Sequence, residues 1–221
     1  MSHSIKGFTL IELLIVIGIL AILATTVVLV LNPAQILAET RDTQRISDLG
    51  SVSSALGLYL ATVANPAFGS VGGDTPAGTA CGDATHWRAS GANAAPISTG
   101  FAPFVSPGTA ASLPASGFRA VDGTGWVSAN LNNISGGSPL GNLPVDPSSN
   151  TATANAVLTG TAGHFYAFQC GNTAATRLQY EIDANMESTK FSNTGTADVE
   201  STDGGNVASV YEIGTSPGLA L

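Results

Sequence analysis

The feature that most constrains this chain is one long apolar run close to its N-terminus. From Phe8 to Leu31 the sequence is almost entirely Leu, Ile, Val and Ala, and Glu12 is the one charged residue within it. A helix rises 1.5 Å per residue, so the run reaches about 36 Å, enough to cross a hydrocarbon core of about 30 Å. The run therefore predicts a membrane-spanning helix.

Glu12 is unusual in such a helix, because burying a charge in lipid costs about 2.5–3.5 kcal/mol even on insertion scales. Two interpretations are open. The side chain reaches the headgroups near the helix end and does nothing specific, or it pairs with a positive charge on another chain. In the second case the attraction strengthens as the local dielectric falls, and Glu12 sets the register between neighbouring chains.

The residues around Glu12 narrow this choice. Lys6-Gly7 followed by Phe8-Thr9-Leu10-Ile11-Glu12-Leu13 closely resembles the prepilin signature of type IV pilins and type II secretion pseudopilins. The resemblance implies that a membrane prepilin peptidase cuts between Gly7 and Phe8, and that the new amino group of Phe8 is methylated. It also implies that Glu12 neutralises the Phe8 amine of a neighbouring subunit during filament assembly.

Beyond the apolar run, Asn32-Pro33 predicts a kink or the point where the helix leaves the bilayer, because Pro33 has no backbone N–H and disfavours helical geometry at Asn32. Apolar residues then recur at steps of three and four, which predicts an amphipathic helix covering a globular domain. These residues are Ile46, Leu49, Val52, Leu56, Tyr59, Leu60 and Val63.

The other faces of this helix carry charges of both signs, from Glu39 through Arg41, Asp42 and Arg45 to Asp48. One interpretation makes them a solvated surface with intrahelical pairs such as Asp42–Arg45, each contributing tenths of a kcal/mol. In the other interpretation they contact neighbouring subunits in a filament. The sequence leaves both open.

From about residue 64 the composition turns to Gly, Ser, Thr, Ala, Asn and Pro, which indicates a loop-rich domain. Aromatic and aliphatic residues within it supply core material: Trp87, Phe101, Phe104, Phe118, Trp126, Val127 and Leu131. Three later segments predict strands, with Leu178, Tyr180 and Ile182 on the helix-facing side: 165–170, 177–182 and 207–213.

The expected fold class is α+β. A long N-terminal helix, with a transmembrane half and an amphipathic half, packs on a small antiparallel β-sheet that has a glycine-rich loop insertion. The segment Leu143–Pro147 and the following strands are also similar, more weakly, to the sheet region of pilins and pseudopilins. The expected divisions are a leader, a membrane and filament-core helix, an amphipathic continuation and an extracytoplasmic head: 1–7, 8–31, 32–63 and 64–221.

Two cysteines, Cys81 and Cys170, fit an exported domain, where such a pair is expected to form a disulfide; two free thiols are the alternative. Acidic residues near the C-terminus offer oxygen ligands for calcium, and the resemblance adds that major pseudopilins hold calcium in a C-terminal loop. A solvated acidic turn is the alternative for these residues: Asp198, Glu200, Asp203 and Asn206.

No pattern in the chain predicts an enzyme. The three histidines, His3, His86 and His164, are not spaced with nucleophiles or carboxylates in a known catalytic or zinc arrangement. The net charge of −8 argues against direct binding of nucleic acid, which depends on neutralising phosphates. No cofactor other than calcium is expected.

The resemblance implies a structural filament subunit that spans the inner (cytoplasmic) membrane once, with its head extracytoplasmic, before it enters a surface pilus or an envelope-spanning fibre. Expected partners are further copies of the chain, membrane lipid, prepilin peptidase, an assembly ATPase and an inner-membrane platform protein. Two alternatives stay open: a pseudopilin of a type II secretion system, and a membrane-tethered extracellular binding module using Trp87 or Trp126.

Overall fold

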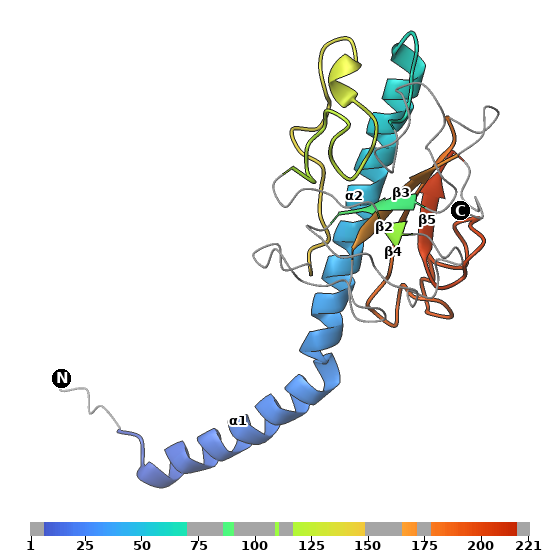
Figure 1. Ribbon diagram of the computed structural model, residues 1–221. Helices are drawn as coiled ribbons and strands as arrows, with labels where there is room; N and C mark the ends of the chain where they lie inside the picture. The colour runs from blue at the N-terminus through green and yellow to red at the C-terminus, as the bar shows by residue number, and fades with distance from the viewer. Residues whose placement is uncertain are drawn as a thin grey trace. The chain divides into compact units, whose positions relative to one another are not determined.

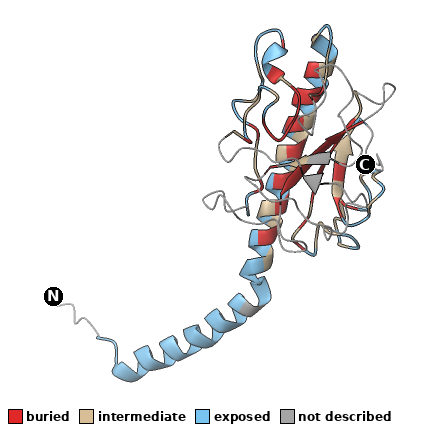
Figure 2. Cartoon of the chain, viewed as in Figure 1, coloured by how far each residue is buried: buried red, intermediate tan, exposed pale blue. Residues whose placement is uncertain are grey.

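The computed structural model describes residues 7–69, 86–90, 109–110, 117–148, 165–171 and 178–215. The chain forms two compact units, Met1–Ala38 and Glu39–Leu221, and the boundary between them falls inside a helix. Figure 1 shows the helices and strands, and Figure 2 shows how far each described residue is buried.

The first unit contains helix α1, Leu10–Leu31, and the start of helix α2, Pro33–Thr62. Asn32 separates the two helices with a left-handed backbone, at φ 39°. Pro33 then takes the first helical position, where its missing N–H costs nothing. One helix thus ends and another begins at Asn32-Pro33, where the sequence predicted a kink in a continuing helix or its exit from the bilayer.

The second unit is built around the rest of α2. Leu49, Val52, Leu56 and Tyr59 are each at most 2% exposed, as their spacing predicted. Figure 1 shows α2 running along one face of the sheet, and Figure 2 shows its buried residues as a stripe. Burying one such side chain stabilises the fold by about 1.5–3 kcal/mol.

Within the described residues the sheet has five strands, in the order β2-β1-β3-β4-β5. Four of them pair antiparallel, and the short β2 pairs parallel with β1. The predicted α+β class with a small antiparallel sheet is thus confirmed. The strands are β1 His86–Ala89, β2 Thr109–Ala110, β3 Tyr166–Cys170, β4 Tyr180–Ala184 and β5 Tyr211–Gly214.

The sequence indicated β3, β4 and β5 within a few residues but missed β1 and β2, which lie in the stretch expected to be loop. Four and two residues are too short to show the alternation that identifies a strand. Pairing with β3 and with each other, rather than a local pattern, places them in the sheet.

An aromatic cluster fills the space between α2 and the sheet. The ring centroid of Phe68 lies 5.7 Å from that of Phe168 and 5.9 Å from that of Tyr180. Both contacts are edge-to-face, which is an arrangement that aromatic pairs prefer. The predicted core residues Phe101 and Phe104, and the side chain of Trp87, lie outside the described residues. The other four predicted core residues are buried: Phe118, Trp126, Val127 and Leu131.

Strand β4 turns two different faces to its surroundings. Tyr180 and Ile182 belong to the core cluster with α2, as expected, whereas Leu178 precedes the strand and is only partly buried. Glu181 and Asp183 alternate with the core residues and therefore point to the opposite face. Both are nevertheless buried, so neither face of this strand is a solvated one.

Candidate assembly site

The start of α1 is held by a reciprocal cap between Thr9 and Glu12. The Thr9 amide and hydroxyl each donate to Glu12 Oε2 at 2.8 Å, and the Glu12 amide donates to Thr9 Oγ1 at 3.3 Å. This capping box satisfies helix donors that otherwise have no partner inside the helix. The Glu12 carboxylate is thereby fixed at the N-terminal end of α1.

The peptide bond between Gly7 and Phe8 lies just before this cap. Residues 7–9 are non-helical, and Phe8 is 83% exposed. A Cβ added at Gly7 meets no atom within 4 Å, so the fold of the chain itself does not require glycine there. The structure thus places the sequence-predicted cleavage residues in an exposed, irregular segment next to the carboxylate of Glu12.

The surface of α1 is apolar and uncovered. Its described side chains are exposed, including Ile11 at 66% and Leu13 at 58%, and Figure 2 shows this exposure along the helix. Thr25 donates to the Ala21 carbonyl and Thr26 to the Leu23 carbonyl, so both hydroxyls are satisfied within the helix. Leu10–Val28 is long and apolar enough to cross a membrane.

The cap satisfies part of the Glu12 carboxylate within a single chain. Oε2 accepts two hydrogen bonds from Thr9. The signal for this cap is present in the sequence, since Thr9 and Glu12 have the three-residue spacing of a capping box. Within the described part of the chain Oε1 accepts no hydrogen bond, which leaves one oxygen for a further partner.

A second polar cluster joins α2 to the head, and it overturns the prediction that Asp42 and Arg45 lie on the helix surface. Both side chains are fully buried. Arg45 donates to both carboxylate oxygens of Asp146, at 2.7 and 3.0 Å, to Asp42 at 2.6 Å and to Ser148 at 3.1 Å. The Asp42–Arg45 pair exists as predicted, but it is part of a buried network.

This network draws in a second loop of the head. The main-chain amides of Glu187 and Ser188 donate to the two oxygens of Asp42, at 2.9 and 2.7 Å. Burial alone would lower the pKa of Arg45, but its hydrogen bonds and attraction to Asp146 and Asp42 outweigh that effect, so the pKa lies above its ordinary value. The guanidinium therefore stays charged and fixes α2 to two loops of the head.

The remaining charges of the predicted surface run also have partners in the head. Arg41 forms an ion pair with Glu187, and the Lys190 ammonium lies 3.1 Å from Glu39. The hydroxyl of Tyr166 donates to Asp48 at 2.8 Å. Each of these side chains thus contacts the same chain, and sequence reasoning missed all of these partners because they are distant along the chain.

Of the two cysteines predicted to form a disulfide, Cys170 is among the described residues. Cys170 ends β3 and is 2% exposed, with its sulfur 3.9 Å from Ser128 Oγ. Cys81 lies outside the described residues, so the pairing of these cysteines stays a prediction.

The predicted calcium ligands mainly bind main-chain amides. Asp198 accepts from the amides of Thr194, Glu200 and Ser201. The carboxylate of Glu200 is buried and accepts from two other amides, and that of Asp203 accepts from the amides of Gly205 and Glu212. These carboxylates therefore already cap turns of the main chain. Calcium binding by this loop stays a prediction.

Comparison with known proteins supports the interpretation of the N-terminus. Residues 2–28 match the family model described as the prokaryotic N-terminal methylation motif. The chain thus carries the signature of type IV pilins and pseudopilins, the group of structural proteins that the sequence resembled. No curated protein and no solved structure matched the chain.

Proposed function

We propose that this chain is a structural subunit of a type IV pilus-like filament that serves adhesion, motility or DNA uptake. The observation that carries the proposal is the combination at the N-terminus: the methylation motif, an exposed Gly7–Phe8 bond and an uncovered apolar helix with Glu12 in its first turn. An uncovered apolar surface of this size calls for lipid before assembly and for other helices afterwards.

Assembly follows from the same chemistry. Prepilin peptidase removes the leader, and the new Phe8 amine is methylated and keeps its positive charge. An assembly ATPase and a platform protein then move α1 from lipid into the filament, where α1 helices of neighbouring chains pack together. Glu12 Oε1 accepts from the Phe8 amine of a neighbour while Oε2 keeps its bonds to Thr9.

This charge pair sets the stagger between subunits. In lipid both the amine and the carboxylate are costly, and pairing them in one register removes much of that cost. Apolar packing alone is not directional. The pair therefore supplies the specificity, and the apolar face of α1 supplies most of the attraction.

The test of this proposal is mass spectrometry of the N-terminal peptide, with material sheared from intact cells compared with the membrane fraction. A methylated chain that begins at Phe8 and is abundant in the sheared material is the expected result. The same peptide confined to membranes would indicate a pseudopilin of a type II secretion system or an unassembled minor subunit. An intact leader would support the membrane-tethered binding module and contradict the proposal.

A matched pair of glycine substitutions sharpens this test. Neither Gly7 nor Gly18 has an atom within 4 Å of an added Cβ, so alanine fits the fold at both positions. We expect Gly7→Ala to slow removal of the leader, because the peptidase reads this position, and Gly18→Ala to leave removal unchanged. Equal processing of both variants would contradict cleavage at Gly7.

A further inference from the structure

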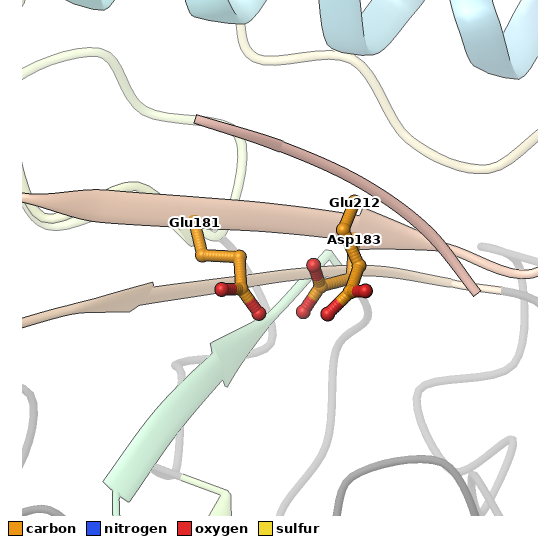
Figure 3. A group of neighbouring side chains, drawn as sticks. All are labelled: Glu181, Asp183 and Glu212. Carbon is orange, nitrogen blue, oxygen red and sulfur yellow. The ribbon is translucent and has the colours of Figure 1, made fainter. Parts of the chain in front are cut away.

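Three carboxylates meet on the face of the sheet opposite α2. Glu181 and Asp183 lie two residues apart on β4, and Glu212 is the register partner of Asp183 on β5. One oxygen from each of the three lies within 4.8 Å of the others. Figure 3 shows the three side chains pointing to the same side of the strands, away from the helix.

This cluster is buried. Glu181, Asp183 and Glu212 are 5%, 3% and 2% exposed. Three adjacent carboxylates cannot all keep their charge in such a place without a compensating partner, since burial and mutual repulsion both oppose ionisation. The cluster therefore needs either shared protons or a bound cation.

A second observation favours a cation. Within the described residues, Asp183 Oδ1 is buried and accepts no hydrogen bond, and Figure 3 shows the Asp183 side chain pointing into the cluster. Asn185, two residues later, also has a buried amide oxygen that finds no hydrogen-bond donor in this part of the chain. Buried polar atoms without partners are rare in folded proteins, and an ion that has not been placed is one of the established explanations.

Other buried or partly buried carboxylates nearby do accept hydrogen bonds from the main chain. Glu200 accepts from the Met186 and Asn193 amides, at 2.9 and 2.8 Å, and Asp203 accepts from two amides as well. The chain has thus satisfied these carboxylates with its own N–H groups. In contrast, none of the described residues donates a hydrogen bond to Oδ1 of Asp183, which is only 3% exposed.

The third side chain is held in place by a close-fitting loop. The Val207 amide donates to Glu212 Oε2 at 2.9 Å. A Cβ added at Gly205 would lie 1.8 Å from that same oxygen, so a larger residue there would displace the carboxylate from this position. The loop thus fixes Glu212 in the cluster, which is the preorganisation that an ion site needs.

We propose that Glu181, Asp183 and Glu212 bind one divalent cation of the type that prefers oxygen ligands, with calcium as the best fit. Calcium binds carboxylate oxygens at about 2.3–2.6 Å, so two of its ligands lie up to about 5 Å apart, which accommodates the observed spacing. The ion neutralises the repulsion and joins β4 to β5. This proposal is independent of the filament proposal.

The test uses the full-length chain in detergent micelles, treated with a chelator and then titrated with calcium, with magnesium in parallel. We expect one calcium per chain by titration calorimetry. We also expect thermal unfolding to shift upward by about 5–10 °C when calcium is about 100 times its dissociation constant. Absence of both effects with either ion would overturn the proposal and assign shared protons to the cluster.

Variants locate the ion. Asp183→Asn keeps the side-chain shape and removes one charge, so we expect it to abolish the calcium-dependent shift. Because it also relieves repulsion, we expect the metal-free variant to unfold at a higher temperature than the metal-free wild type. Asp198→Asn, in the neighbouring loop, is the matched control and should keep the shift. A shift retained in Asp183→Asn, or lost only in Asp198→Asn, would overturn the proposed location.

Discussion

Helices α1 and α2 are both rich in apolar residues, yet they place them in opposite surroundings. Leu13 of α1 is 58% exposed, whereas Leu56 of α2 is fully buried against the core of its own chain. The charged residues follow the same division. Among the described residues, one oxygen of Glu12 accepts no hydrogen bond, whereas Arg45 donates to the carboxylates of Asp42 and Asp146. The comparison indicates that α2 completes a fold and that α1 requires something outside the chain.

The largest effect that would sharpen this comparison is expected from Glu12→Leu. Removing one partner of a charge pair that is buried on assembly costs about 3–5 kcal/mol, so we expect the filament yield to fall by about 100-fold or more. The leader should still be removed, and the head should unfold as in the wild type. The measurement is quantification of sheared filaments by immunoblot and electron microscopy.

Thr9→Ala is the control for this variant. It removes the Thr9 hydroxyl that binds Glu12 and weakens the start of α1 by about 0.5–2 kcal/mol, but it keeps the carboxylate. We expect a loss of filaments of about tenfold or less. Normal filaments from Glu12→Leu would contradict the assembly role and leave helix capping as the function of Glu12.

Arg45→Ala tests the second half of the comparison. The substitution leaves Asp42 and Asp146 buried without their cation, so we expect the free energy of unfolding to fall by about 3–5 kcal/mol. Urea unfolding followed by the fluorescence of buried Trp126 measures it. Arg41→Ala, which removes a more exposed ion pair, should change stability far less. Equal effects of the two would contradict a special role for the buried network.

A smaller effect is expected when a leucine is replaced by alanine in α2 or, in a separate variant, in α1. Leu56→Ala should lower the free energy of unfolding of the head by about 2–5 kcal/mol, because it leaves a cavity in the core. Leu13→Ala should leave head unfolding unchanged and reduce only the filament yield. The same urea titration measures both variants, and a clear loss of head stability in Leu13→Ala would break the proposed division.

Much of the fold could be predicted because its signals are local. An apolar run identifies α1, and steps of three and four residues identify the buried face of α2. An aromatic segment before a turn identifies β3, and an alternating segment after it identifies β4. The cap between Thr9 and Glu12 was equally local and could have been found from its three-residue spacing.

The contacts that fix the head could not be predicted in the same way. Arg45 and Asp146 are 101 residues apart, and nothing near either residue indicates the other. The alternation in β4 correctly separates Glu181 and Asp183 from the core residues. It does not reveal that their face is also buried, because burial there depends on how the rest of the chain folds over it.

The most direct test of this account is a helical reconstruction of purified filaments at a resolution that shows side chains. The account predicts that α1 is buried among α1 helices of other subunits. It also predicts that Glu12 lies within hydrogen-bonding distance of the methylated Phe8 amine of a neighbour and keeps its bonds to Thr9. A filament in which Glu12 contacts only its own Thr9, with no amine of another chain nearby, would contradict the central claim.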